Sequence, residues 1–443
     1  MIHFLQRLIY GSHSSRNVPV QDRGHGRDRF SSFDVHNDST TTGGCAGTAP
    51  AAHLQRLGPS IAGFAVDLYR QLALHAADVD DVACSSRSYW TRVNVVFSPF
   101  AVAAALSMTL AGARGRSAEE IASVLHIQND GKIHGHFSTE LTHIASRTMA
   151  VTFEMANHLY SDQRYPVSEA YLAFLRGTYG EDIVNAVDFA ACHREVREEA
   201  NERVAGGTVD MIHELLTPDS VGPTTQLAIV SAAYLYGPWE SPFQPAFTGP
   251  DEFHVDGHTA VRVDMMNQMH SYGVAHCDQL QATALEMPHL GGKTSMVIIL
   301  PDKMDGLSHL EGNLTAKRLS DLLHGLRERP NVMLRLPKFA VVLGRGLRDA
   351  LRGAGVRELF TAQANLAGMF EAGSPALADV FHGAFLEVNE EGAELPSLAT
   401  DAELGGGPGL GDIMHFVVNR PFMFLVGPRR TNVFFLMGSV RRP

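Results

Sequence analysis

The chain has 443 residues, of which 45% are hydrophobic, so it is long enough to bury a large core in one domain or in several. Its formal net charge of −12 argues against a nucleic-acid surface, which would show clustered Lys and Arg. The four cysteines lack Cys-x-x-Cys spacing, and no apolar run approaches the ~18 to 20 residues that cross a bilayer, so we expect no zinc site, no disulfide framework and no membrane span.

Residues 1–57 are rich in Ser, Thr, Gly, Arg and His and hold few apolar residues after Tyr10. Such a segment cannot bury enough apolar surface to offset its ordering entropy, so we predict a disordered polar extension. The apolar residues before Tyr10 are interrupted by His3, Gln6 and Arg7, and they do not form the continuous stretch of a secretory signal peptide. The sequence therefore leaves the compartment open.

A folded domain is predicted over residues 58–443. Ser60 precedes apolar residues at helical spacing, among them Ile61, Phe64 and Leu68, and it predicts the start of an amphipathic helix. A strand, a turn and a helix of small residues are expected from Asn94 to Leu110 and its neighbours.

The C-terminal part of the chain predicts a strand that leads into an exposed loop. Leu386 and Val388 alternate with polar residues, as in a half-buried strand, and Gly392 supplies a bend. The glycine-rich segment 404–411 has too little side chain to pack. Two apolar runs of strand length follow, at residues 416–426 and 434–440.

Other chemistries are poorly supported. Gly292-Lys-Thr is not a phosphate-binding loop, because Met287 stands where that motif needs its first glycine and a strand follows instead of a helix. His134, His136 and His143 have no carboxylate at ligand spacing, so we interpret them as surface histidines rather than a metal site. Gly-x-Ser-x-Gly and His-Glu-x-x-His are absent, and we therefore expect no enzyme, no metal and no cofactor.

Three motifs resemble those of a known family. They read Glu387-Val-Asn-Glu-Glu-Gly-Ala-Glu, Arg420-Pro-Phe-Met-Phe-Leu and Phe435-Leu-Met-Gly. Together they resemble the reactive-loop and C-terminal signatures of the serpin superfamily, and the similarity covers residues 58–443. The resemblance implies an α+β fold in which three β-sheets are surrounded by about eight or nine helices and an exposed reactive loop.

The resemblance also implies a function. A serpin inhibits serine-type endopeptidases as a suicide substrate: its loop is cut as bait, and the freed hinge inserts as an extra strand into the main sheet. The resemblance favours an extracellular, soluble monomer whose partner is a serine protease, and a cytoplasmic location is the alternative because no signal peptide is evident. A non-inhibitory serpin that acts as a binding, carrier or chaperone-like protein is the alternative.

Site residues follow from the resemblance, position by position. The shutter beneath the main sheet comprises Ser98, Pro99, Ser231 and His382, and the breach at the top of the sheet comprises Trp239 and Lys338. The hinge comprises Glu390, Glu391, Gly392, Ala393, Glu394, Leu395, Pro396, Ser397 and Leu398, and the family's spacing places the reactive bond at Gly406-Gly407. We expect Glu390 to pair with Lys338 beside Trp239, and His382 to approach Ser98 and Ser231.

The hinge departs from the small residues that inserting serpins usually carry. Leu395, Pro396 and Leu398 would enter a central strand, where proline donates no ladder hydrogen bond. Asp401 and Glu403 would point inward and bury carboxylates, which is costly unless they are paired or protonated. We therefore expect a trap that is slow or incomplete, although shallow insertion of the first hinge residues remains open.

The bait favours some proteases over others. No Lys or Arg occurs from Glu390 to Asn419, so a trypsin-like target is not expected. Leu404, Leu410 or Met414 would suit chymotrypsin-like or elastase-like pockets if the register of the loop differs from the family's spacing.

Overall fold

The computed structural model describes residues 52–77, 94–127, 131–145, 151–393 and 412–443. All of these belong to one compact unit, Ala49–Pro443. None of the helices in these ranges is long and apolar enough to cross a membrane. Most of the predicted polar extension, residues 1–57, lies outside the described residues.

Nine α-helices occur within the described ranges: α2 (Ala52–Ala77), α4 (Pro99–Gly112), α5 (Gly115–Val124), α6 (Lys132–Ala145), α7 (Glu169–Thr178), α8 (Phe189–Gly207), α9 (Leu307–Asn313), α10 (Ala316–His324) and α11 (Arg348–Ala354). Two 3₁₀ turns are also present, η1 (Pro245–Phe247) and η2 (Glu358–Phe360).

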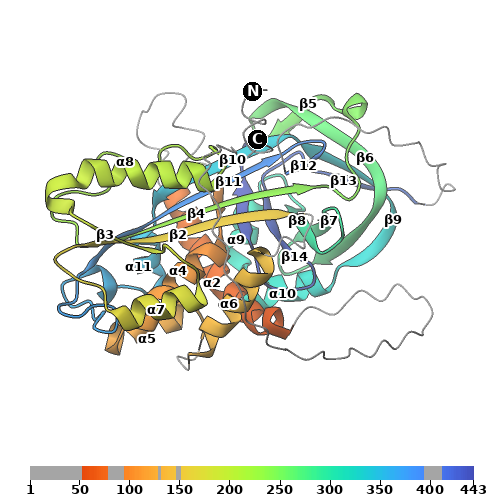
Figure 1. The fold of residues 1–443 in the computed structure, drawn as a ribbon. Coiled ribbons are helices and arrows are strands. Elements are labelled where there is room, and N and C mark those ends of the chain that lie inside the picture. Colours follow the sequence, from red (N-terminus) through yellow and green to blue (C-terminus); the bar gives the residue numbers. More distant parts are fainter. Residues whose placement is uncertain (1–51, 78–93, 128–130, 146–150, 394–411) are drawn as a thin grey trace, which may run out of the picture. The chain divides into compact units, whose positions relative to one another are not determined.

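A six-stranded sheet forms the centre of the fold (Figure 1). Its order is β10 (Phe339–Gly346), β11 (Leu377–Val388), β4 (Leu227–Pro238), β2 (Thr152–Asp162) and β3 (Val184–Val187), and a short strand, β12 (Gly392–Ala393), pairs with the end of β4. Strands β11 and β4 are parallel, whereas β4 and β2 are antiparallel.

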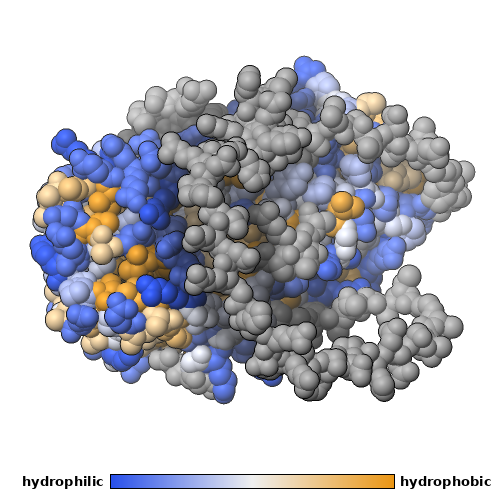
Figure 2. All heavy atoms as spheres, in the orientation of Figure 1, coloured by the Kyte–Doolittle hydropathy of each residue, from blue (hydrophilic) through white to orange (hydrophobic). Residues whose placement is uncertain are grey.

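Helices cover both faces of this sheet because its strands are apolar on both sides. Val196 and Ala200 of α8 pack against Val230 and Ala232 of β4, and the charged face of α8 is turned to solvent (Figure 2). The flanking residues of the same strand, Ile229 and Ala233, belong to the larger core that contains α2 and α4. Near-continuous apolar strands are expected for a sheet that is buried on both faces.

The second sheet has nine strands in the described part of the chain. Its path is β1 (Val95–Phe97), β15 (Leu436–Val440), β14 (Phe422–Pro428), β8 (Thr294–Pro301), β7 (Ala282–Pro288), β6 (Ala260–Cys277), β9 (Arg327–Pro337) and β13 (Met414–Val417), and β5 (Gly249–His254) pairs with β6. The α+β class is confirmed.

The expected three sheets appear as two hydrogen-bonded networks among the described strands. Strand β6 has 18 residues, and it pairs with β5 from Ala260 to Met265, with β9 from Met265 to Val274 and with β7 from Gly273 to Cys277. A register shift between His270 and Tyr272 marks the bend. One long strand thus joins two of the predicted sheets, and the sequence pattern did not reveal this.

The first described helix starts earlier than predicted. Helix α2 begins at Ala52, so Ser60 lies inside it and does not cap it. Leu54 and Leu57 are buried and extend the apolar stripe toward the N-terminus. The Ser60 hydroxyl donates instead to the backbone oxygen of Leu125, which ties α2 to the end of α5.

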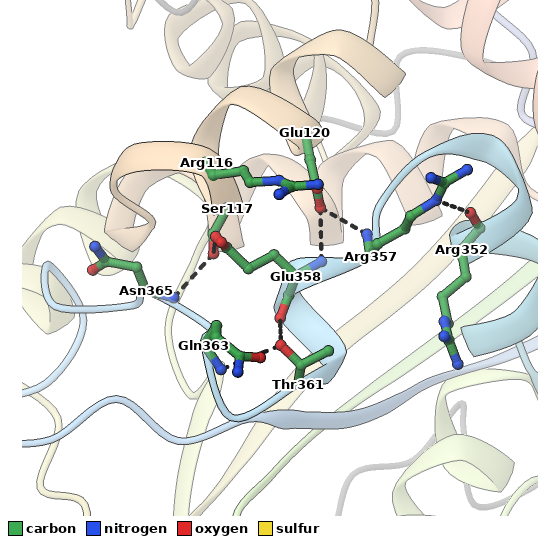
Figure 3. Close-up of polar contacts among 9 residues, drawn as sticks. All are labelled: Arg116, Ser117, Glu120, Arg352, Arg357, Glu358, Thr361, Gln363 and Asn365. Carbon is green, nitrogen blue, oxygen red and sulfur yellow. Dashed lines mark hydrogen bonds and ion pairs between the residues drawn. The ribbon is translucent and has the colours of Figure 1, made fainter.

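A polar cluster fastens α5 to η2 (Figure 3). Glu120 Oε2 accepts hydrogen bonds from the backbone N–H groups of Arg357 and Glu358, both at 2.7 Å, and the Ser117 hydroxyl donates to Glu358 Oε2 at 2.6 Å. Burial raises the pKa of Glu120, but these backbone hydrogen bonds and the Arg116 contact outweigh it and lower the pKa. This cluster holds the segment that leads into β11.

Candidate functional site

The hinge begins with a tight turn where the chain leaves β11. The Asn389 N–H donates to the Gly392 oxygen at 3.0 Å, and Asn389 Oδ1 accepts from the N–H groups of Glu391 at 3.0 Å and Gly392 at 3.2 Å. Asparagine favours such turns because its short side chain can hydrogen-bond the backbone ahead of it. The turn directs the chain back along β4.

After this turn, β12 pairs antiparallel with the end of β4. Gly392 lies opposite Pro238, and Ala393 lies opposite Gly237. A Cβ on Gly392 would overlap the backbone oxygen of Gly237, so only glycine fits at this close approach. The first hinge residues are therefore already paired with the six-stranded sheet, which is the main sheet of the fold.

Trp239 holds the hinge turn through its indole and its backbone. Its Nε1–H donates to the Asn389 oxygen at 3.1 Å, and its backbone N–H donates to the Glu391 oxygen at 2.9 Å. The side chain is 3% exposed. Since both bonds end on residues of the Asn389–Gly392 turn, Trp239 connects the end of β4 directly to the start of the hinge.

The expected ion pair is present beside Trp239. Lys338 Nζ lies 2.9 Å from Glu390 Oε2, which confirms the predicted contact. Burial raises the pKa of Glu390, but the hydrogen bond from Lys338 and further hydrogen bonds outweigh it and lower the pKa. Whether this pair serves as a latch in function stays a prediction.

The sequence analysis missed His289, which stacks on Trp239. The ring centroids lie 4.9 Å apart and the planes differ by 12°. Burial lowers the pKa of His289 to about 3. From the sequence, a histidine that follows Pro288 in a glycine-rich hairpin is expected at the surface. Only the packing of that hairpin against the end of β4 brings His289 into contact with Trp239.

The predicted shutter residues also meet. His382 Nε2 accepts from the Ser98 N–H at 2.9 Å, so Nδ1 carries the ring hydrogen and donates to Ser231 Oγ at 3.0 Å. The Ser98 hydroxyl is used elsewhere, since it caps α4 by accepting from the Ala101 N–H at 3.0 Å. Pro99 occupies the first helical position, where its missing N–H costs nothing. Burial lowers the pKa of His382 to about 3.

Asn157 is a further member of this cluster that the sequence analysis missed. It lies opposite Ser231 in the β2–β4 ladder, and its Nδ2 donates to the Ala101 oxygen at 3.0 Å. Its Oδ1 is buried and has no hydrogen-bond partner among the described residues. The available signal was a lone polar residue on the inward face of a strand that also carries Phe153 and Leu159.

Several predicted site residues lie outside the described residues. These are Glu394, Leu395, Pro396, Ser397 and Leu398 of the hinge, and Gly406 and Gly407 at the predicted reactive bond. Asp401, Glu403, Leu404 and Leu410 lie there as well. Their roles stay predictions.

One of the three interpreted surface histidines is buried. His134 Nδ1 lies 3.1 Å from the Ser107 hydroxyl and 2.7 Å from the Tyr179 hydroxyl, because α4, α6 and the end of α7 meet there. The described residues contain no cluster of three potential metal ligands. The turn after His289 leads into strand β8, as expected for a hairpin and not for a phosphate-binding loop.

A cleft of about 700 Å³ opens beside Trp239, between the nine-stranded sheet and α10. Its lining combines apolar residues such as Leu425 and Val297 with polar ones such as His324 and Arg327. Its lining also includes a partly buried ion pair, in which Arg429 donates to both oxygens of Glu286 at 2.9 and 2.7 Å.

Comparison with known proteins gives consistent results. The family model described as "Serpin (serine protease inhibitor)" matches residues 60–443. Iris from Ixodes ricinus is 42% identical over 381 residues, which cover 86% of this chain and 97% of that protein. Leukocyte elastase inhibitor A from Mus musculus is 32% identical over 359 residues, which cover 79% and 93%. The crystal structure of uncleaved ovalbumin superposes with a TM-score of 0.75 at 25% identity and covers 87% of this chain and 100% of that one.

Proposed function

Because this chain belongs to the serpin family, we propose that it inhibits a serine protease as a suicide substrate, with residues 394–411 as the bait. The protease cuts the reactive loop, and the freed hinge then enters the main sheet between β4 and β11. In this role the protein acts as an inhibitor and not as an enzyme. The soluble chain works alone as an extracellular monomer.

The position of β12 carries the proposal. Gly392 and Ala393 pair with Pro238 and Gly237 at the end of β4, so the first residues of an inserting strand already lie at the entrance. The ladder between β4 and β11 ends with the pair Tyr234 and Phe385. Beyond that point the two strands are not paired with one another, and the hinge uses the free edge of β4.

Full insertion exchanges one ladder for two. It must break the parallel pairing between β4 and β11 that runs from Leu227 and Leu377 to Tyr234 and Phe385. The inserted strand would then pair antiparallel with both neighbours, and parallel pairing is slightly less stable per residue. At ~0.5 to 1.5 kcal/mol for each hydrogen bond, a full strand releases on the order of 10 kcal/mol.

The hinge sequence weakens this trap. Beyond Ala393 the inserting strand would carry Leu395, Pro396 and Leu398, and the proline removes one ladder hydrogen bond. Small residues would fill the same strand without displacing the core beneath it. Insertion therefore proceeds slowly or stops after the first residues.

The target is a chymotrypsin-like or elastase-like protease. The loop has no Lys or Arg from Glu390 to Asn419, and a relative that is 32% identical is named a leukocyte elastase inhibitor. A trypsin-like S1 pocket would find no basic residue to bind in this segment.

A second candidate is a non-inhibitory serpin that carries a small molecule. The cleft beside Trp239 favours it, because it is concave and its lining offers both apolar surface and polar groups that could orient a ligand. A carrier of this kind would bind its ligand without any cut in the reactive loop.

One experiment separates the two functions. The purified chain is incubated with chymotrypsin, with leukocyte elastase and with trypsin, and the mixtures are resolved by denaturing electrophoresis. We expect a covalent complex with chymotrypsin or elastase, together with a cut inhibitor band, and none with trypsin. Cleavage of the loop by chymotrypsin and elastase without any covalent complex would refute inhibition and leave the carrier function.

A further inference from the structure

A buried histidine lies directly beneath the hinge, and the trapping mechanism gives it no role. The His289 side chain is 0% exposed and lies against Trp239, which holds Asn389 and Glu391. The ring also faces Gly237, the β4 residue that lies opposite Ala393 of β12. A change in the ring is therefore transmitted to the hinge through Trp239 and through Gly237.

The ring nitrogens have little hydrogen bonding. Nδ1 lies 3.5 Å from the Thr294 hydroxyl, at the limit of a hydrogen bond, and Nε2 has no partner among the described residues. Nε2 faces Gly237, where an added Cβ would lie 3.2 Å from Nε2 and 2.9 Å from Cδ2. Gly237 is also the residue that pairs with Ala393 of β12.

Among the residues that the structure describes, no carboxylate forms a hydrogen bond or an ion pair with this ring. Burial lowers the pKa of His289 to about 3, opposed only by the backbone hydrogen bond with Thr294. The ionisable groups on the described elements around the ring include Glu154, Tyr236, Glu240, Glu286, Lys293, Lys338, Glu390, Glu391 and Arg429. Of these, Glu286 is held by both hydrogen bonds from Arg429. Gly237 faces the His289 ring, and Val151 lies on the same side of the sheet. Because side chains alternate along a strand, Glu154 and Tyr236 point to the opposite face of the sheet. Glu390 is held by its ion pair with Lys338.

We propose that His289 is a positioning residue for the hinge, and that it keeps Trp239 and the hinge turn in place only while its imidazole is uncharged. The proposal rests on the proposed inhibitor function, because there the hinge must leave this turn before it can insert into the sheet. A buried charge without a partner is strongly disfavoured. Protonation therefore favours any state in which the corner formed by His289, Trp239 and β12 opens and water reaches the ring.

The expected size of the effect follows from linkage. In the open state the imidazole recovers an ordinary pKa near 6.5, whereas in the closed state it resists protonation. The open fraction therefore increases by up to about tenfold for each pH unit below 6.5. Acid should loosen β12 and the Asn389–Gly392 turn before the main sheet unfolds.

The test uses two readouts that need no protease. The sequence contains two tryptophans, Trp90 and Trp239, so a Trp90→Phe background leaves Trp239 as the only indole. Its fluorescence and the amide exchange of residues 389–393, corrected for the intrinsic rate, are measured at pH 7.5 and 5.5. We expect about tenfold faster exchange at pH 5.5 and a red shift of the Trp239 emission.

The His289→Phe variant keeps an aromatic ring against Trp239 and cannot be charged. We expect it to match the parent at pH 7.5 and to lose the change at pH 5.5. His415→Gln is the matched control, because it removes an exposed histidine of β13 and leaves the corner intact. It should behave as the parent does. If His289→Phe does not fold, His289→Tyr carries the same comparison.

Two results would overturn the proposal. One is a parent chain whose hinge exchange is equal at both pH values, and the other is a His289→Phe variant that keeps the full pH response. A chain that forms no covalent protease complex could still show the response, so failure here and failure of the inhibitor function are distinguishable.

Discussion

The shutter should become more stable if Ser231 is replaced by Asn. In the structure Ser231 Oγ accepts from His382, while Asn157 Oδ1 lies opposite, buried and without a partner in the described residues. Directly opposed residues of an antiparallel pair have Cβ atoms about 5 Å apart, within reach of an amide. The new Oδ1 can accept from His382, and the new Nδ2 can donate to Asn157.

The magnitude follows from two opposing terms. A buried polar atom left unpaired costs about 1 to 3 kcal/mol, and Ser231→Asn removes this cost at Asn157 Oδ1. The extra atoms crowd a fully buried site, which offsets part of the gain. We expect a net increase of about 1 kcal/mol in the free energy of unfolding, measured by urea denaturation and as a higher Tm.

A double-mutant cycle tests the reasoning. Ser231→Ala should lower stability by about 1 kcal/mol, since it leaves the His382 N–H without an acceptor. In an Asn157→Ala background, the gain from Ser231→Asn should disappear, because the amide has lost its partner. A neutral or negative effect of Ser231→Asn, or an equal gain with and without Asn157, would refute this account of the shutter.

Three further predictions follow from the same structure. Glu120→Ala should lower the free energy of unfolding by about 2 kcal/mol, measured by urea denaturation, because two backbone N–H groups lose their acceptor; an effect near zero would count against the cluster. The pKa of His382 is about 3 in the folded state and near 6.5 in the unfolded state, so only the unfolded state gains a proton as the pH drops below 6.5. The free energy of unfolding should therefore fall by about 1.4 kcal/mol for each pH unit below 6.5. Equal unfolding free energies at pH 7.5 and 5.5 would contradict this. Nicking the reactive loop should raise the Tm of the parent only slightly, and replacing Leu395, Pro396 and Leu398 by Ala should increase that gain; a parent that already gains tens of degrees would show that the hinge inserts freely.

Much of the site could be predicted because its motifs are local. The order of Glu387-Val-Asn-Glu-Glu-Gly-Ala-Glu places an acidic hinge directly after a half-buried strand, and the structure shows β11 followed by the turn and β12. The Glu390 and Lys338 contact could be expected once both residues were assigned to the top of one sheet. Prediction failed where a polar residue in a polar stretch became buried. His134 is the clearest case, since it bonds with Ser107 and Tyr179 from two other helical regions.

By itself the sequence determined the α+β class, the family and the residues that surround the hinge, because strand alternation, turn glycines and the hinge motif are properties of neighbouring residues. Only the tertiary structure decided that β6 joins two predicted sheets, that Asn157 lies opposite Ser231, and that His289 lies under Gly237 and against Trp239. These features depend on which distant strands become neighbours. The hydrogen bonding and the charge of a buried side chain are set by those neighbours, and no local pattern specifies them.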